Sequence, residues 1–481
     1  MASLKSLAKD TAIYGLSSII GRFLNYLLVP IHTSAMSAQS GGYGVVTNVY
    51  AWVALVLVIL TCGMETGFFR FANNGKDEPM RVYSTSLLFV SMGASVFLFL
   101  GLLFLAPIAG WMGYEEHPWY VGMMMIVVTM DAIQAVPFAC LRYQKKPLRF
   151  ATLKLLFIFI SITLNLIYYK GMKGSDPGAA FAINLLCTGF IMLCMIPQFR
   201  GFSYVFDREL FRRLFRYCLP LLVLGIAGIL NQVADKIIFP LVYPDEDQGI
   251  VELGIYGASV KIAMIMAMLT QAFRYAYEPF VFGKSQDKDS KEIYAEAMKF
   301  FIIFTLLAYL AVMFYLDILR YIIGRGDYWE GLSVVPIVMM AEIFMGVYFN
   351  LSFWYKLIDE TKWGAYFSLI GCAVLILVNV VFIPRFSYHA CAWAGFAGYG
   401  TAMLLSYFVG QKKYPIHYPL KSIACYVLLA AVLYVAGLYL PIDNMVLRLA
   451  WRTLLLLVFV AYIVRKDLPL KSIPIVNRFI K

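Results

Sequence analysis

The stretch GLSSIIGRFLNYLLVPI, residues 15–31, decides the fold class, because it is apolar enough to cross a bilayer and yet carries Arg22 near its centre. A membrane-spanning helix needs about 20 mainly apolar residues. A charge at membrane depth costs roughly 2.5–3.5 kcal/mol on insertion scales, so such a side chain usually faces a cavity or a partner. The stretch therefore predicts a transmembrane helix with one cation directed away from lipid.

The composition of the whole chain agrees with a membrane protein. Of its 481 residues, 62% are hydrophobic and 14% are charged, whereas about a quarter of a soluble domain is charged. Apolar windows of spanning length recur, and we predict an all-α polytopic membrane protein with about fourteen transmembrane helices. Their approximate bounds are 11–31, 44–67, 82–106, 118–140, 151–169, 178–197, 217–239, 251–273, 297–319, 332–352, 363–384, 388–409, 420–441 and 446–464.

The distribution of Lys and Arg predicts the orientation of these helices. Short cytoplasmic loops are enriched in the two residues, and most of the 40 fall on one side of the predicted membrane. The opposite loops hold only Lys170, Lys173, Arg320, Arg325 and Arg385. Both termini are therefore predicted to be cytoplasmic. The net charge of +12 then reflects topology and anionic lipid, and no nucleic-acid partner is expected.

A weak internal repeat predicts how the helices are grouped. When the opening stretch is aligned with the seventh apolar window, Asn25 matches Asp235. Farther along the same alignment, after a short insertion, Gly44 matches Gly257, and each of these glycines follows a tyrosine. The offset spans six helices, so the halves have the same orientation, as in transporters built from parallel repeats. The alternative is chance similarity between apolar helices. The repeat predicts two pseudo-symmetric six-helix bundles, over 1–200 and 201–410, and two additional helices with a basic tail over 411–481.

Six motifs follow one another in order along the chain. They are GLSSIIGRFLNYLLVPIHT, YGVVTNVY, GMETGFFRFA, CLRYQKKPLRF, YCLPLLVLGIAGILNQVADKIIF and LGIYGASVKIA. The chain resembles the Wzx-type polysaccharide biosynthesis flippases, the oligosaccharide flippase family. These flippases belong to the multidrug/oligosaccharidyl-lipid/polysaccharide (MOP) exporter superfamily. The motifs that carry this resemblance lie in about residues 5–300, and the predicted helix layout agrees with it over the whole chain. One departure is Lys236, where the family often has Arg.

The resemblance implies a MATE-like fold and a transporter rather than an enzyme. Its cargo would be a polyprenyl-diphosphate-linked oligosaccharide, moved by alternating access from the cytoplasmic to the outer leaflet for O-antigen, capsule or exopolysaccharide synthesis. The implied location is the bacterial cytoplasmic (inner) membrane. Membrane lipid, a glycan polymerase and glycosyltransferases of the same pathway are the expected partners.

Polar residues at membrane depth are the candidate substrate-binding site. They are Arg22, Asn25, Asn48, Asn231, Gln232 and Lys261. Arg22 suits a diphosphate, because guanidinium stays charged and forms forked hydrogen bonds to phosphate oxygens. Lys261 would be a second anion contact, and the amides would bind sugar or hold helices apart. The alternative is that carboxylates of this chain neutralise Arg22 and Lys261, which would then only hold helices together.

Four further charged residues are candidates for ion coupling or structural pairing. They are Asp131, Asp235, Lys236 and Glu342. Adjacent residues point in different directions on a helix, which predicts separate partners for Asp235 and Lys236. At the start of the last window, Arg448 and Arg452 are predicted to reach lipid headgroups.

The energy source stays open at this point. The chain has no P-loop for a nucleotide, so transport would use substrate supply or a proton or sodium gradient. The cysteines and histidines lack metal-ligand spacing, and no metal or cofactor is expected.

Two other functional classes are open. A MATE-like multidrug or organic-cation antiporter would be favoured by a cavity lined with unpaired acids, and the central Arg22 and Lys261 argue against it. A polytopic glycan polymerase or glycosyltransferase would normally present a sizeable outer loop, and the predicted outer segments are all short.

Overall fold

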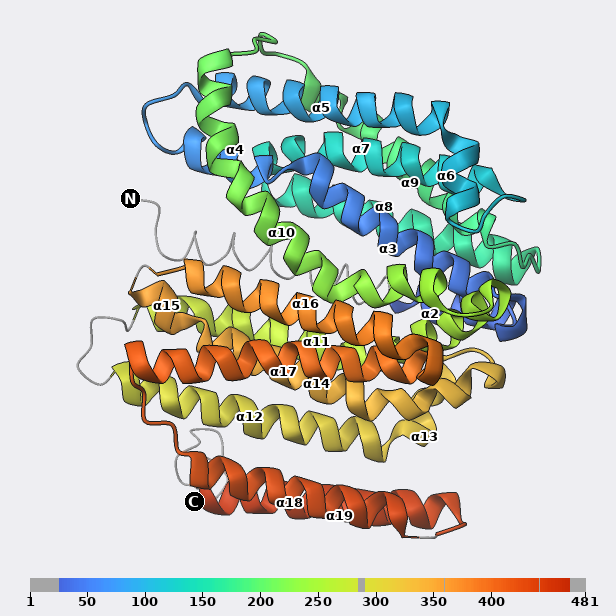
Figure 1. Cartoon of the computed structure of the whole chain (residues 1–481), viewed down its shortest axis with the longest axis vertical. Coiled ribbons are helices and arrows are strands. Elements are labelled where there is room, and N and C mark those ends of the chain that lie inside the picture. The colour runs from blue at the N-terminus through green and yellow to red at the C-terminus, as the bar shows by residue number, and fades with distance from the viewer. Residues whose placement is uncertain (1–25, 284–289, 359, 441, 468–481) are drawn as a thin grey trace. The chain divides into compact units, whose positions relative to one another are not determined.

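The computed structural model describes residues 26–283, 290–358, 360–440 and 442–467 (Figure 1). Within these ranges all regular structure is helical. Eleven helical stretches are long and apolar enough to cross a membrane. Two more predicted windows coincide with Gly178–Cys194, which is shorter, and with Tyr388–Lys413. The remaining window, 11–31, lies mainly outside the described residues. The prediction of an all-α polytopic fold is confirmed.

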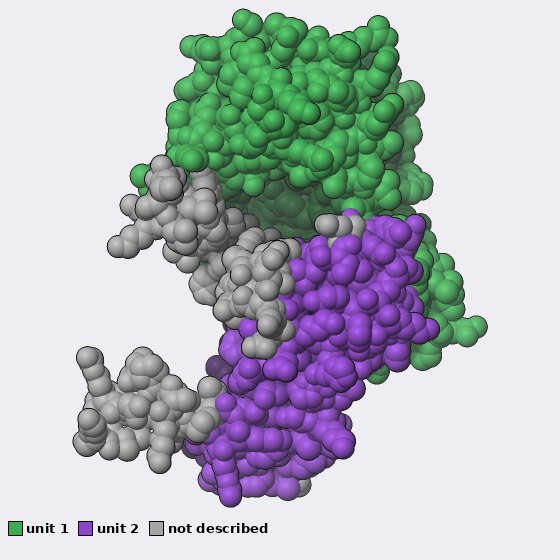
Figure 2. Space-filling view, turned by 90° about the vertical axis from the view of Figure 1, so that its left-hand side faces the viewer, with its two compact units in different colours: residues 1–261, 323–331, 368–394 green, residues 262–322, 332–367, 395–481 purple. Residues whose placement is uncertain are grey.

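The chain divides into two compact units (Figure 2). Unit 1 comprises residues 1–261, 323–331 and 368–394, and unit 2 comprises 262–322, 332–367 and 395–481. The predicted division into 1–200, 201–410 and 411–481 is based on the sequence repeat, whereas the two units are defined by their compactness. The predicted division therefore stays a prediction.

The described helices are assigned to the units as follows. Unit 1 contains α2 (Leu28–Ala35), η1 (Ala38–Ser40), α3 (Gly42–Thr61), α4 (Met64–Ala72), α5 (Pro79–Leu103), α6 (Leu105–Trp111), α7 (Pro118–Tyr143), α8 (Pro147–Asn165), η2 (Leu166–Gly171), α9 (Gly178–Cys194), η3 (Ile196–Phe199) and α10 (Arg208–Val242). Unit 2 contains α12 (Ser290–Phe314), α13 (Leu316–Leu319), η4 (Arg320–Ile322), α14 (Val335–Leu351), α15 (Phe353–Leu357), α18 (Leu420–Tyr439) and α19 (Met445–Lys466). Residues of both units occur in α11 (Glu246–Gly283), η5 (Gly326–Val334), α16 (Lys362–Phe386) and α17 (Tyr388–Lys413).

Local sequence signals fix several helix starts. Pro79, Pro118 and Pro147 stand in the first turn of α5, α7 and α8, where the missing N–H costs nothing and the fixed φ suits a helix. Asp207 caps α10 by accepting hydrogen bonds from the backbone N–H groups of Glu209 and Leu210, both at 3.0 Å. A capping carboxylate satisfies two of the donors that a helix N-terminus leaves unpaired.

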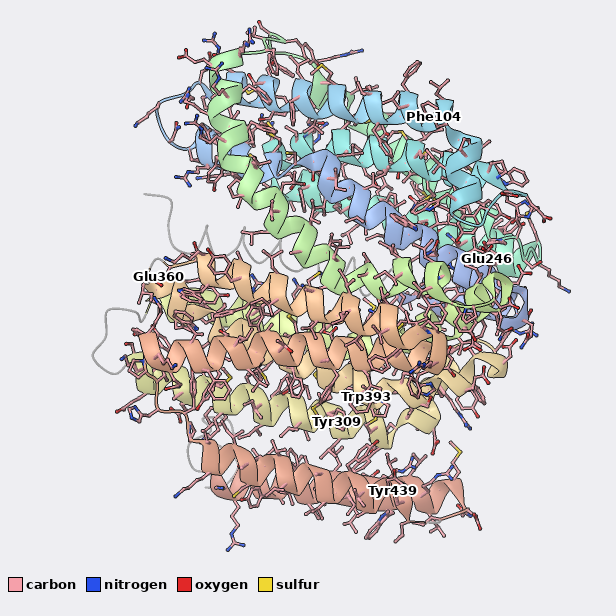
Figure 3. The ribbon with its side chains drawn as sticks, in the orientation of Figure 1. Phe104, Glu246, Tyr309, Glu360, Trp393 and Tyr439 are labelled. Atoms are coloured by element: carbon pink, nitrogen blue, oxygen red, sulfur yellow. The ribbon has the colours of Figure 1, made fainter. Side chains whose placement is uncertain are left out.

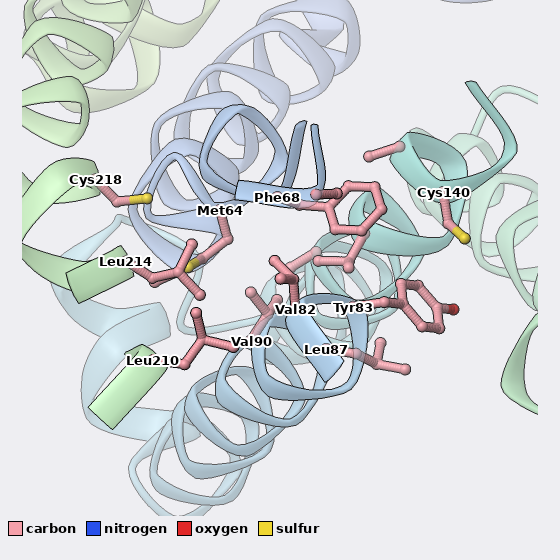
Figure 4. Close-up of a cluster of buried hydrophobic side chains, with 14 of the residues drawn as sticks. Met64, Phe68, Val82, Tyr83, Leu87, Val90, Cys140, Leu210, Leu214 and Cys218 are labelled. Carbon is pink, nitrogen blue, oxygen red and sulfur yellow. The ribbon is translucent and has the colours of Figure 1, made fainter. Parts of the chain in front are cut away.

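A buried cluster joins α4, α5, α7 and α10 inside unit 1 (Figure 4). Met64 and Phe68 of α4 have no exposed surface, and Leu214 of α10 is buried equally completely. Tyr83 of α5 packs its ring edge-on against Phe68, with ring centroids 6.0 Å apart. In this part of unit 1 the helices are therefore held by close packing.

In unit 2, the α18–α19 hairpin packs on α12 through a second buried cluster. Arg452 of α19 is 6% exposed. Its guanidinium donates to the carbonyls of Gly437 and Phe314 at 3.0 and 3.1 Å, and to Asp317 Oδ2 at 2.9 Å. Arg448 pairs with the same carboxylate at 3.0 Å. The prediction that these arginines reach lipid headgroups is therefore wrong, because an acid from a distant segment lies beside them.

Large apolar side chains are exposed on many of the helices. Phe104, Trp393 and Tyr439 are examples, with exposed fractions of 54%, 52% and 77% (Figure 3). Extensive apolar surface is rare on soluble monomers and natural on helices in contact with lipid. Together with the eleven spanning stretches, it identifies a multi-pass membrane protein.

Candidate functional site

Eight of the ten predicted site residues lie in the described part of the chain. Arg22 and Asn25 lie outside it, so their predicted role stays a prediction. Six of the eight, on α3, α10 and α11, belong to unit 1, and Asp131 lies on α7 of the same unit. Glu342 lies on α14 in unit 2, where it is partly buried.

Asp235 and Lys236 form an ion pair with each other. The Lys236 ammonium lies 2.9 Å from both carboxylate oxygens of Asp235, and it also donates to the Gln232 carbonyl at 3.0 Å. Tyr256 of α11 donates its hydroxyl to Asp235 Oδ2 at 2.7 Å. The prediction of separate partners is wrong, because the flexible lysine side chain folds back along the helix. The Asp235 carboxylate thus joins α10 to α11.

Asn48 is fully engaged by the protein. It is 2% exposed, its amide nitrogen donates to the Lys236 carbonyl at 2.8 Å, and its oxygen accepts from the Tyr114 hydroxyl at 2.8 Å. A buried amide that is satisfied on both sides acts as a brace between segments. Asn48 therefore connects α3 to α10 and to the loop before α7.

The two amides of α10 differ in exposure. Asn231 is 6% exposed, and its nitrogen donates to the Ala227 carbonyl at 2.9 Å and lies 3.4 Å from the carbonyl and hydroxyl oxygens of Ser368. Gln232 is exposed and donates to the Gly228 carbonyl at 3.2 Å. Asn231 thus connects α10 to α16 within unit 1, while the Gln232 side chain is accessible.

Lys261 of α11 is partly buried, and it makes no hydrogen bond or ion pair with any residue in the described ranges. Its charge interacts repulsively with that of Lys236 and with protonated His32. His32 itself is buried and lies 2.7 Å from the Asn165 side-chain oxygen. An unpaired ammonium beside a second cation at membrane depth is costly without an anion. The arrangement can therefore bind an anionic group.

The carboxylates that could have neutralised Lys261 within unit 1 have other partners. Asp235 pairs with Lys236, and Asp131 of α7 lies beside Lys154 and Thr188. The same lysine is attracted to Glu65 of α4. Among the described residues of unit 1, neither Asp131 nor Asp235 is therefore available to neutralise Lys261 as a structural partner.

Lys154 is a candidate that the sequence analysis missed. It interacts with Asp131, and its ammonium lies 4.1 Å from the centroid of the Phe138 ring. Glu65, its other acidic neighbour, forms an ion pair with Arg142 at 2.9 Å. The only sequence feature that could have pointed to Lys154 is its position in the first turn of the apolar window 151–169. That signal is weak, because a lysine so near the end of a window usually extends to the interface.

Metal chemistry has no evident site in the described ranges. No group of three or more His, Cys, Asp or Glu side chains there could hold a metal ion. The chemistry available in unit 1 is instead anion binding by ammonium groups, with hydrogen bonds from amides and hydroxyls.

Comparisons with known proteins show related folds. A family model described as polysaccharide biosynthesis protein matches residues 7–277. The structure is similar to that of the lipid II flippase MurJ in its inward closed conformation, with a TM-score of 0.75 and 15% identity, covering 94% of this chain and 98% of that chain. It is also similar to a multidrug resistance MATE family transporter of the MOP superfamily. The inward-facing conformation gives a TM-score of 0.62 at 15% identity, covering 83% and 97% of the two chains. The outward-facing conformation gives a TM-score of 0.58 at 15% identity, covering 84% of this chain and 95% of that chain. No curated protein matches the sequence.

Proposed function

The chain belongs to the polysaccharide biosynthesis protein family, and from this premise we propose that it is a flippase for polyprenyl-diphosphate-linked oligosaccharides. It would move these lipids from the cytoplasmic to the outer leaflet by alternating access. The family model matches more than half of the chain, and the fold is that of MurJ and MATE transporters. We further propose the bacterial inner membrane as the location, with both termini cytoplasmic.

The observation that carries the proposal is the Lys261 ammonium, which has no hydrogen-bond or ion-pair partner among the described residues. A diphosphate is an anion that must cross hydrocarbon together with hydroxyl-rich sugars, while the polyprenyl chain can stay in lipid. Lys261 supplies positive charge at membrane depth, whereas the charge of Lys236 is neutralised by Asp235. The exposed Gln232 amide adds hydrogen-bonding capacity. Arg22, if it faces the same region, would add a bidentate phosphate contact.

Reconstituted vesicles test the proposal directly. The purified protein is placed in vesicles that contain a labelled polyprenyl-diphosphate oligosaccharide, and the label accessible on each face is followed with time. We expect the lipid to equilibrate between leaflets only when protein is present. A cationic dye is followed in parallel. Dye movement coupled to an ion gradient, with no movement of the lipid-linked sugar, would reject the flippase in favour of an antiporter.

Variants of Lys261 test whether this residue binds the anion. Lys261→Met should abolish flipping and Lys261→Arg should retain part of it, because the charge is kept and only the geometry changes. The matched control is Lys76→Met, which removes an equal charge from an exposed loop. Wild-type flipping by Lys261→Met would remove Lys261 from the site.

A further inference from the structure

The first turns of α10 carry three arginines on one side of the helix. Arg208, Arg212 and Arg216 follow one another at four-residue intervals, the spacing that places side chains on the same helix face. All three are exposed, and none forms a hydrogen bond or an ion pair with any residue that the structure describes. At a rise of 1.5 Å per residue, they extend over about 12 Å of the helix. We call these three residues the arginine row.

The opposite face of α10 is fixed inside unit 1. Leu210 is 1% exposed, and Leu214 and Cys218 have no exposed surface. All three belong to the buried cluster that joins α10 to α4, α5 and α7 (Figure 4). With 3.6 residues per turn, these side chains point away from the arginine row. The row is therefore carried by a firmly packed helix.

Two acids at this end of unit 1 are bound by other arginines. The Arg213 guanidinium donates to both carboxylate oxygens of Asp77, at 2.6 and 3.2 Å, and Arg81 lies 3.1 Å from Asp207. Glu209 is exposed beside the row, and no ion pair joins it to any of the three arginines. Even with Glu209 counted, the row keeps a net positive charge. Its guanidinium groups are available to an anionic ligand.

Exposed apolar side chains continue the face of the arginine row toward the middle of α10. Leu219 and Val223 are 46% and 48% exposed, and around the helix axis both lie between the directions of Arg208 and Arg216. The predicted span is 217–239, so Arg216 lies at its cytoplasmic edge and the rest of the row extends into the headgroup layer. One face of α10 therefore offers guanidinium groups at headgroup level and apolar surface beside the acyl chains.

This arrangement fits a lipid whose headgroup contains two linked phosphates. Guanidinium binds phosphate through forked hydrogen bonds. Arg212 and Arg216 are one turn apart, with Cβ atoms separated by about 5–6 Å, so each arginine can bind one phosphate of the same diphosphate. A phospholipid headgroup with a single phosphate offers only half of this contact. Charge complementarity therefore favours a diphosphate lipid on the row.

We propose that the arginine row is the docking site at which the lipid-linked oligosaccharide is captured from the cytoplasmic leaflet. Arg212 and Arg216 bind the diphosphate, and Arg208 attracts it from the surface of the leaflet. The polyprenyl chain lies along Leu219 and the apolar surface that follows. This inference rests on the proposed function and deepens it, because it separates capture at the row from binding at Lys261.

Binding of a labelled polyprenyl diphosphate without sugar tests the row by itself. The protein is placed in phosphatidylcholine nanodiscs, and Lys261→Met is present throughout to remove the deeper site. Adding Arg212→Gln/Arg216→Gln should weaken binding about tenfold, the factor for two exposed ion pairs. The matched control is Lys421→Gln/Arg465→Gln, which removes the same charge from exposed positions on the predicted cytoplasmic side. Equal binding by the two sets of variants would overturn the proposal.

The lipid composition separates a diphosphate lipid from ordinary phospholipid. The binding experiment is repeated with phosphatidylglycerol added to the nanodiscs. Its general surface charge acts on all variants alike, so the difference between the intact row and Arg212→Gln/Arg216→Gln should persist. If phosphatidylglycerol abolished this difference, the row would be a site for phospholipid headgroups, and the proposed docking of the diphosphate would be wrong.

The vesicle assay tests the order of capture and transport. Arg212→Gln/Arg216→Gln, with Lys261 intact, should need about tenfold more lipid-linked oligosaccharide for half-maximal flipping, while the maximal rate stays within twofold of wild type. A reduced maximal rate with unchanged half-saturation would place these arginines in the transport step and contradict a docking role. If the wild-type protein flips nothing, the proposed function fails, and the nanodisc experiment still decides whether the row binds the diphosphate.

Discussion

The best-defined perturbation in unit 2 is the replacement of Arg452 by methionine, which keeps the length of the side chain and removes its charge. The guanidinium donates three hydrogen bonds, to the carbonyls of Gly437 and Phe314 and to the Asp317 carboxylate, at 2.9–3.1 Å. The hydrogen bonds to Phe314 and Asp317 hold the α18–α19 hairpin to the end of α12 and to α13, and the one to Gly437 joins α19 to α18. We expect Arg452→Met to loosen this end of the hairpin and leave unit 1 unchanged.

The expected magnitude follows from the three hydrogen bonds that methionine cannot make. Side-chain hydrogen bonds in membrane proteins average about 0.6 kcal/mol, which gives roughly 2 kcal/mol for three. Removing one partner of a buried ion pair costs about 3–5 kcal/mol in soluble proteins, but here Asp317 keeps Arg448 at 3.0 Å. We therefore expect about 2 kcal/mol, which corresponds to an opening of the hairpin that is about 30-fold more frequent.

Hydrogen–deuterium exchange in detergent measures this opening. Amides at the α18–α19 connection should exchange about 30-fold faster in Arg452→Met, the factor that corresponds to about 2 kcal/mol. The matched control is Arg448→Met, which loses one ion pair at 29% side-chain exposure and a long hydrogen bond of 3.4 Å to the Ile442 carbonyl; it should change exchange by only about twofold. An Arg452→Met variant that exchanges like Arg448→Met would refute the reasoning and would mean that the buried guanidinium contributes no net stability.

Three further predictions concern unit 1. Asp207→Ala should lower the free energy of unfolding by about 1 kcal/mol through loss of the α10 cap, measured as a lower melting temperature. The backbone N–H of Leu210 holds the pKa of Asp207 below its usual 3.8; the cap is therefore fully present above that pH, and the difference between wild type and variant should shrink as the pH falls below it. Tyr114→Phe should cost about 1–3 kcal/mol in thermal unfolding, because it leaves the Asn48 oxygen without its donor; an unchanged melting temperature would contradict this. Lys261→Met should raise the melting temperature slightly while flipping is lost, because it removes an ammonium that has no partner in the described part of the chain; a large fall would indicate that Lys261 has a structural partner.

Helix positions were predictable because hydrocarbon imposes one simple requirement. A spanning segment needs a long apolar run, whatever packs against it, and the described helices therefore coincide with the predicted windows. The break between α3 and α4 at Cys62–Gly63 was not predictable inside the window 44–67. Cysteine is no helix breaker, and an isolated glycine is a weak signal in a membrane helix.

Side-chain partners were less predictable, because they depend on segments far apart in the chain. Arg452 reaches Asp317 from 135 residues away, and no local pattern indicates this pair. The error at Asp235 and Lys236 has a different cause. Their Cβ directions diverge as the helix requires, but a lysine carries four methylene groups and can return its ammonium to the neighbouring carboxylate. Backbone geometry therefore limits a short side chain far more than a long one.

The matching Tyr-Gly pairs of the predicted repeat have a structural explanation. Gly44 and Gly257 coincide in the two halves of the sequence, and in unit 1 each packs on the helix that carries the other, Gly44 on α11 and Gly257 on α3. A residue larger than glycine at either position would meet Ile250 or Thr47 at less than 3.0 Å. If the two halves began as one duplicated bundle, the same small residue would be required twice, once on each side of the contact. The close approach of α3 and α11 thus gives a reason for the Tyr-Gly repeat that binding of cargo does not provide.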